Sequence, residues 1–176
     1  WVLGVSEALP LADASVDGVM LTIALHHFRS LAEAGTEMRR VCPSGPIVLF
    51  LIDPREAVPF WFADYFPDIR ARMYDTYRPV GEIAATMFPG SRCEVIPFPL
   101  PADFSDMNMH SGWNRPEIYL DGTSRQNMSP FALASEEEIE RGTSRLQADL
   151  ASGAWDAAHG ALRSAESLDL GFRFLV

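Results

Sequence analysis

The first half of the chain shows long apolar runs separated by turn residues. Residues 17–25 (DGVMLTIAL) are apolar throughout after the opening Asp-Gly, which predicts a strand buried on both faces. Residues 46–52 (PIVLFLI) form a second such run, ended by Asp-Pro. Between the two runs, Ser30 and Glu33 have the spacing of a capping box, which predicts a helix start. Strand, helix and strand in this order predict a βαβ unit in a parallel sheet.

The second half is less regular. Seven aromatic residues crowd residues 60–77, which predicts one or two helices, and residues 82–88 predict a further short helix. Residues 93–98 are a strand candidate that prolines confine to a sheet edge. Residues 102–130 are polar and irregular, and Ser135 with Glu138 is a second capping box, which opens a helix.

In the last segment, apolar residues alternate with other residues at a period of two. A short helix is expected over 155–162, and the closing residues predict a half-buried antiparallel strand. One face of that strand would carry Leu168, Leu170, Phe172, Phe174 and Val176, and the other face Asp169, Gly171 and Arg173. The elements together predict one α/β domain.

Composition and charge exclude several classes of protein. The chain has 176 residues and a formal net charge of −10, which argues against nucleic acid or an anionic membrane surface as the main partner. No apolar run reaches the length of a transmembrane helix. The two cysteines, Cys42 and Cys93, form neither a disulfide framework nor a CxxC metal motif, so no bound metal is expected. Reduced cysteines also favour a cytoplasmic location.

Residues 4–54 carry the most specific pattern of the sequence. It begins with Gly4-Val5-Ser6-Glu7-Ala8-Leu9-Pro10 and an apolar strand, followed by Leu25-His26-His27, a helix that ends in Arg-Val, Pro-Ser-Gly and a second strand. This order resembles the class I S-adenosylmethionine-dependent methyltransferases, in particular the type 11 group related to the ubiquinone and menaquinone biosynthesis enzymes. The closing Asp-Leu-Gly-Phe-Arg-Phe is similar to the end of such enzymes.

The resemblance implies a Rossmann-like methyltransferase fold, with a mostly parallel sheet and an antiparallel C-terminal strand. It also implies S-adenosylmethionine as the methyl donor and a small molecule as the acceptor. The glycine-rich first turn of the family does not occur in this sequence, so the N-terminal part of the domain is expected to be missing. Residues 1–176 are then a single incomplete domain, with 55–128 as a lid or substrate region.

The family pattern also implies positions for the cofactor. It places Val5, Ser6 and Glu7 beside the adenine, and Ala24, Leu25 and His26 near the methionine part. An open parallel sheet binds its ligand at the carboxyl ends of its strands, which agrees with this placement. Val5 stands where the family often has Asp.

Other candidate residues have two interpretations each. His27 is a candidate general base, although both histidines could simply pack the turn, where adjacent histidines are expected to point in different directions. The substrate candidates are an aromatic residue of the lid and four residues of the irregular region: Trp61, His110, Trp113, Arg115 and Tyr119. Alternatively, at least half of the rings in 60–77 are core, and the 110–119 set is an ordinary surface loop.

Three functional hypotheses follow. The first is methyl transfer to an O, N or C atom of a small molecule, with this chain as the C-terminal portion of the enzyme. The second is a degenerate relative that acts as a binding or dimerising module, since an unpaired first strand would favour association, for instance as a homodimer. The third is a nicotinamide dehydrogenase, which only the βαβ layout supports.

Overall fold

The computed structural model describes residues 1–176, which divide into two compact units. Unit 1 comprises Trp1–Glu56, Tyr77–Phe98 and Gly171–Val176. Unit 2 comprises Ala57–Thr76 and Pro99–Leu170. The predicted lid region 55–128 is therefore divided, because its residues 77–98 belong to unit 1.

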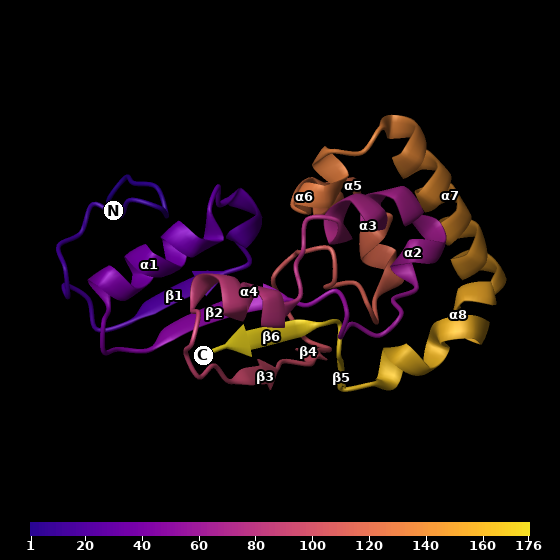
Figure 1. The fold of residues 1–176 in the computed structure, drawn as a ribbon. Helices are drawn as coiled ribbons and strands as arrows, with labels where there is room; N and C mark the ends of the chain where they lie inside the picture. Colours follow the sequence, from indigo (N-terminus) through magenta and orange to yellow (C-terminus); the bar gives the residue numbers. More distant parts are fainter. The chain divides into compact units, whose positions relative to one another are not determined.

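Unit 1 is built on a four-stranded sheet in the order β1-β2-β6-β3 (Figure 1). The strands are β1 (Val19–Thr22), β2 (Ile47–Ile52), β3 (Val95–Pro97) and β6 (Phe172–Leu175). β1 and β2 are parallel, and β6 runs antiparallel to both of its neighbours, β2 and β3. The prediction of a mostly parallel sheet is therefore wrong for this chain, whose sheet is mixed. The predicted edge position of the proline-rich strand is confirmed.

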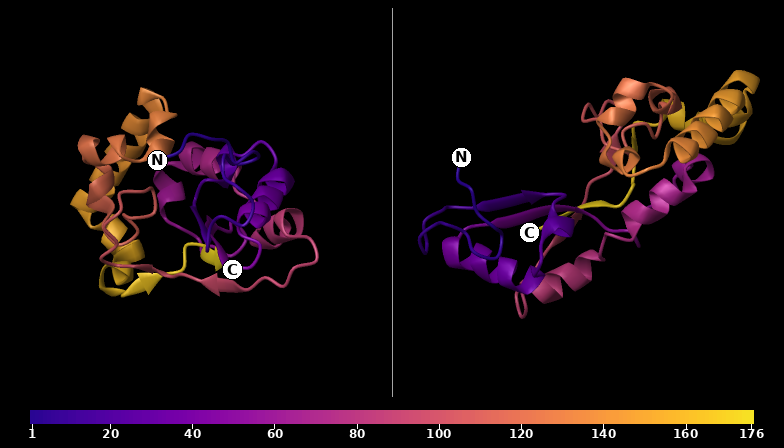
Figure 2. Two further views of the ribbon diagram at one scale, coloured as in Figure 1. Left: turned by 90° about the vertical axis from the view of Figure 1, so that its left-hand side faces the viewer. Right: turned by 90° about the horizontal axis from the view of Figure 1, so that it is seen from above.

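Two helices cover one face of this sheet (Figure 2, right). They are α1 (Leu31–Val41) and α4 (Val80–Met87), and their apolar residues pack with Leu49, Leu51 and Leu175 of the strands. Gly35 of α1 lies against the backbone of Met87, where a Cβ atom would collide. The two helices can therefore approach closely only because this residue is glycine.

The opposite face of the sheet is aromatic. The ring of Phe50 lies 4.7 Å from that of Phe174, 5.3 Å from Phe98 and 5.5 Å from Phe172, measured between centroids. Met20 on the same face is 66% exposed. The prediction that the first strand is buried on both faces is therefore wrong, because β1 is the outer strand and alternates between partly buried and exposed residues.

The closing strand also differs from its prediction. Gly171, at φ 86°, separates β5 (Ser167–Leu168), which pairs with β4 (Leu100–Pro101) in unit 2, from β6 in unit 1. Arg173 is only 4% exposed, because its face of β6 is the one on which Leu51 and Leu175 meet the helices. Val176, expected inside, is 41% exposed.

Unit 2 is mainly helical. Its early helices are α2 (Phe62–Tyr65) and α3 (Pro67–Tyr74), and the aromatic stretch that forms them is largely core, as one interpretation predicted. The later elements are the 3₁₀ helices η2 (Pro116–Tyr119) and η3 (Gly160–Ser164) and the helices α5 (Gly122–Gln126), α6 (Ser129–Ala132), α7 (Glu136–Ser152) and α8 (Ala154–His159). The capping box at Ser135 and Glu138 is confirmed with both of its hydrogen bonds. None of the helices is long and apolar enough to cross a membrane.

Candidate functional site

A strained turn follows β1 at the carboxyl edge of the unit 1 sheet. Ile23 has φ 43°, and its N–H donates to the carbonyl of Phe50 at 2.8 Å. A positive φ is unfavourable for a β-branched residue, and such strain persists mainly where the surroundings enforce it, often at functional sites. The chain then turns through Ala24 into the 3₁₀ helix η1 (Leu25–His27). The strain thus marks the turn that the sequence assigned to the cofactor.

The two histidines of this turn are exposed and close to each other. Their ring centroids are 4.0 Å apart, so the expectation that they point in different directions is wrong. Desolvation of the ring, assisted by the neighbouring His27, lowers the pKa of His26. His26 is therefore neutral at pH 7 and would not repel a cationic ligand.

Glu7 connects the second predicted cofactor segment to this turn. Its Oε1 accepts hydrogen bonds from the N–H groups of Arg29 at 2.7 Å and Ser30 at 3.1 Å, and its Oε2 accepts one from the hydroxyl of Ser6 at 2.9 Å. These bonds, that from Ser30 above all, lower the pKa of Glu7. The structure thus brings residues 5–7 next to the chain that leaves the histidine turn.

The same bonds change the predicted capping box of α1. The hydroxyl of Ser30 accepts from the N–H of Glu33, as a capping box requires, but the N–H of Ser30 donates to Glu7. The reciprocal half of the box is therefore supplied by a residue 23 positions earlier in the chain. A local motif alone cannot reveal such a partner.

An ionic network holds the rest of the N-terminal loop on α1. Glu37 accepts from the N–H of Leu9 at 2.8 Å and pairs with Arg40 at 2.7 Å. Arg40 also pairs with Asp13 at 2.7 Å and donates to the carbonyls of Leu9 and Leu11. The hydrogen bonds that Glu37 accepts from Arg40 and from the N–H of Leu9 lower its pKa to about 2. The loop that carries residues 5–7 is therefore fixed by charges that the sequence analysis did not single out.

Asp53 is a further residue that the sequence analysis missed. It follows β2, is 6% exposed, and accepts from the N–H of Arg55 at 2.9 Å and from that of Val80 at 2.8 Å. The second bond satisfies an N–H at the start of α4. Its signal in the sequence is the Asp-Pro that ends the apolar run. The carboxylate positions elements at the ligand edge and has no oxygen left without a partner.

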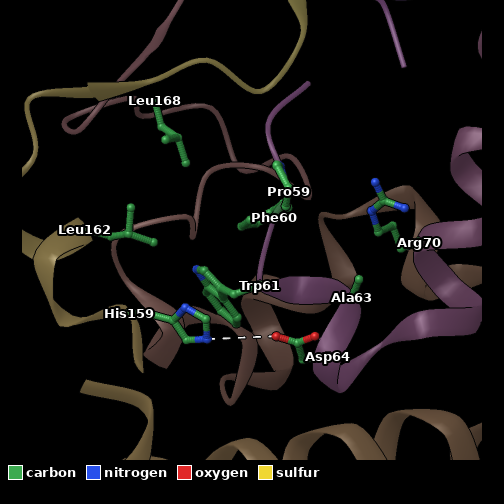
Figure 3. A pocket seen from close by; sticks show the side chains of 9 residues that line it. All are labelled: Pro59, Phe60, Trp61, Ala63, Asp64, Arg70, His159, Leu162 and Leu168. Atoms are coloured by element: carbon green, nitrogen blue, oxygen red, sulfur yellow. Dashed lines mark ion pairs between the residues drawn. The ribbon is translucent and has the colours of Figure 1, made fainter. Parts of the chain in front are cut away.

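Unit 2 contains a cavity of about 380 Å³ (Figure 3). Its lining is largely apolar and aromatic, with three ionisable groups: Pro59, Phe60, Trp61, Ala63, Asp64, Arg70, His159, Leu162 and Leu168. His159 and Asp64 face each other across 3.9 Å between Nε2 and Oδ2, whereas the guanidinium of Arg70 points away from this pair. The volume falls in the range of small-molecule sites.

The predicted substrate residues have different environments. Trp61 lines the cavity, and its indole N–H donates to the carbonyl of Trp113 at 2.8 Å. Trp113 and Tyr119 are both 0% exposed and pack in the core of unit 2, and His110 is 2% exposed. Arg115 donates to the carbonyls of Phe104 and Ser111, so it braces a loop. Only Trp61 of the five lines this cavity.

The structure shows no group of three or more His, Cys, Asp or Glu residues that could hold a metal ion. Cys42 is buried at the end of α1, and both cysteines are free. The arrangement in unit 1 is thus an exposed turn and loop held by backbone hydrogen bonds, and that in unit 2 is a cavity whose apolar and aromatic lining also carries Arg70 and the His159–Asp64 pair.

Comparison with known proteins decides the family. The model of the type 11 methyltransferase domain matches residues 1–50. A crystal structure from Anabaena variabilis, described as a "putative methyltransferase from antibiotic biosynthesis pathway", is 38% identical, with a TM-score of 0.94 over 99% of this chain and 71% of its own. The chain belongs to the methyltransferase family. A search of curated proteins found no match.

Two more distant structures are also methyltransferases by description. A protein from Bacillus halodurans is 14% identical with a TM-score of 0.43, covering 99% of this chain and 74% of its own. A phosphoethanolamine N-methyltransferase from Haemonchus contortus, solved with S-adenosylhomocysteine, is 14% identical with a TM-score of 0.37. This match covers 97% of this chain and 34% of the Haemonchus protein. Neither likeness is close enough to carry an argument about this methyltransferase.

Methyltransferases of this family use S-adenosylmethionine as the methyl donor. Two features of unit 1 fit that molecule. The lowered pKa of His26 keeps positive charge away from the turn that the family pattern assigns to the methionine part. The backbone of residues 5–7 is held by Glu7 and left accessible at Val5, which is 56% exposed.

Proposed function

We propose that this methyltransferase transfers a methyl group from S-adenosylmethionine to an O, N or C atom of a small molecule, and that the ligand edge of unit 1 holds the donor. The observation that carries the proposal is the strained turn at Ile23, tied through Arg29 and Ser30 to Glu7. It ties residues 5–7 to the chain that leaves residues 24–26, the second segment that the family pattern assigns to the same molecule.

The residues have distinct roles in this proposal. The backbone and side chains of Val5 and Ser6 contact the adenine, while Glu7 is a positioning residue because its oxygens already accept three hydrogen bonds. Ala24, Leu25 and His26 contact the methionine part. The exposed imidazole of His27 is the candidate base for an acceptor that must lose a proton.

The bound donor supplies a sulfonium-activated methyl group. What the protein adds is therefore mainly orientation of the acceptor in line with that group, which can account for much of the rate. Such a reaction requires few reactive side chains.

Calorimetric titration with S-adenosylhomocysteine tests the donor site. We expect the full chain to bind it, and Leu25→Arg to abolish binding while the far-ultraviolet circular dichroism is retained. Because Leu25 also packs against the core of unit 1, His26→Ala is a second variant that leaves this packing intact. We expect weaker binding in His26→Ala and unchanged binding in the control Leu133→Arg, since Leu133 is 80% exposed in unit 2.

A folded chain that does not bind S-adenosylhomocysteine would contradict the proposal. Equal affinity in the wild type and both turn variants would remove the turn from the donor site. A clean dimer without any binding would favour the non-catalytic module, and tight binding of NADH alone would favour the dehydrogenase.

A further inference from the structure

Arg70 is a cation at the cavity of unit 2 that forms no ion pair. It lies on α3 and is one of the residues that line the cavity (Figure 3). Its Nε is buried and has no hydrogen-bond partner. Other arginines of the same unit bond to carboxylates or to backbone carbonyls, such as Arg72 to Glu138 at 2.8 Å and Arg115 to the carbonyls of Phe104 and Ser111. Arg70 takes part in none of the ion pairs of the structure.

Two neutral side chains lie next to Arg70. Its guanidinium lies over the ring of Tyr74, 4.2 Å from the centroid, and the Tyr74 hydroxyl is 3.3 Å from Nε2 of His110. Complete burial, with the charge of Arg70 as a smaller cause, lowers the pKa of His110 to about 3. His110 is therefore uncharged at neutral pH, and the one carboxylate of the cavity lining, Asp64, pairs with His159 and not with Arg70.

A buried donor without a partner is costly, on the order of 1–3 kcal/mol, and the Nε of Arg70 is such a donor. Because this atom is covered, a ligand in the cavity would meet the outer nitrogens of the guanidinium. Guanidinium groups bind carboxylates through charge-assisted hydrogen bonds, often two in parallel. Arg70 is the one arginine of the cavity lining.

The rest of the lining restricts the ligand. Phe60, Trp61, Leu162 and Leu168 present apolar and aromatic surface, which suits a hydrocarbon or aromatic body. Asp64, although paired with His159, adds a negative charge to the lining. A singly charged carboxylate therefore suits this cavity better than a doubly charged phosphate.

We propose that Arg70 binds the carboxylate of a small aromatic or aliphatic acid whose body occupies the cavity of unit 2, and that such acids are the class of methyl acceptor. The second part rests on the proposed function. The anion site itself does not, because it is argued only from the residues around the cavity.

Titration with benzoate and with its uncharged isostere benzamide tests the anion site. The Arg Nε–Hε signals of the full chain are followed by NMR, and Arg70→Gln identifies the Arg70 signal by its loss. We expect benzoate to shift this signal and to bind about tenfold more tightly than benzamide. The indole signal of Trp61 should report the same preference, which Arg70→Gln abolishes.

The matched control is Arg141→Gln, which removes the same charge from an exposed position of unit 2 and should keep the preference for benzoate. Equal shifts by benzoate and benzamide, absence of any shift, or an unchanged preference in Arg70→Gln would overturn the anion site. A stronger response to inorganic phosphate than to benzoate would overturn the carboxylate class.

The same samples separate this proposal from the proposed function. S-adenosylhomocysteine is added after benzoate and followed at residues 24–26. If benzoate binds through Arg70 and S-adenosylhomocysteine does not bind, the donor proposal fails and the anion site stands. If only S-adenosylhomocysteine binds, the anion site fails and the donor proposal stands.

Discussion

In unit 1, charged side chains from distant parts of the sequence form hydrogen bonds with one another and with backbone N–H groups. Unit 2, in contrast, has buried polar atoms without hydrogen-bond partners. The oxygens of Glu7, Glu37 and Asp53 all accept hydrogen bonds, mainly from backbone N–H groups. The buried side-chain atoms without a partner all belong to unit 2: Arg70 Nε, Trp113 Nε1, Asn114 Oδ1, Arg115 Nε and Trp155 Nε1.

This difference matches the proposed roles of the two units. A donor common to a whole family needs a fixed backbone, and unit 1 fixes its N-terminal loop through the carboxylates of Glu7 and Glu37. An acceptor site must suit one substrate, and the cavity of unit 2 is lined by aromatic rings and by Arg70. Buried polar groups without partners are expected to be paired by ligand or water.

The largest expected effect removes the aromatic centre of unit 2. Trp155 is 0% exposed, and its ring meets that of Trp61 edge-on at 5.2 Å. Trp155→Ala should lower the free energy of unfolding by about 3–5 kcal/mol, because it leaves a large cavity. Urea unfolding followed by circular dichroism measures the loss. Leu133→Ala at an exposed position is the control, and a similar small loss in both variants would contradict the assignment of Trp155 to the core.

A pair of conservative changes tests the unpaired donors. The indole N–H of Trp61 donates to Trp113, whereas the indole N–H of Trp155 has no partner. Trp61→Phe leaves a buried carbonyl without its donor and should destabilise by about 1–3 kcal/mol more than Trp155→Phe. Equal losses in urea unfolding would show that the indole of Trp155 is hydrogen-bonded in solution.

A third comparison concerns helix starts. Ser135 begins α7 with a complete capping box, while Ser30 begins α1 with its N–H bound by Glu7. Ser135→Ala should cost about 0.5–2 kcal/mol. Ser30→Ala should cost less, since the hydroxyl of Ser30 only accepts from Glu33, whereas that of Ser135 accepts from the N–H of Glu138 and also donates to its carboxylate. Thermal melting of the two variants measures the difference, and a larger loss for Ser30→Ala would contradict this comparison of the two caps.

The smallest effect is the acid dependence of two partly exposed ion pairs, Glu37 with Arg40 and Glu138 with Arg72. Hydrogen bonds from Arg40 and Leu9 lower the pKa of Glu37 from 4.5 to about 2, and those from Arg72 and Ser135 do the same for Glu138. A depressed carboxylate pKa stabilises the fold above pH 4.5, and this stability is lost as the pH falls towards 2. Melting temperatures between pH 7 and 2 should therefore fall less steeply in Glu37→Gln and Glu138→Gln than in the wild type. Parallel curves would contradict the pairing.

The local elements of unit 1 could be predicted from the sequence because apolar runs and cap residues are local signals. The strands at 19–22 and 47–52 and the helix between them are confirmed. The mixed sheet could not be predicted, since the alternation of 168–176 continues through Gly171 and gives no sign that the chain changes partner strands there.

The candidate site shows the same limit. The turn at 24–26 follows from a family motif, but the bond of Glu7 to Ser30 spans 23 positions and Arg70 has no motif at all. Trp113 and Tyr119 illustrate the opposite case, because aromatic residues in a polar segment suggested a substrate wall and the structure buries both. Burial of a side chain depends on tertiary packing that residue type does not encode.

The most direct test of the division between the units is an NMR map of S-adenosylhomocysteine binding to the full chain. We predict the largest backbone shifts at residues 5–7 and 24–26, with the indole signal of Trp155 unchanged. Shifts centred on residues 59–70, with residues 5–7 and 24–26 unaffected, would contradict the assignment of the donor to unit 1.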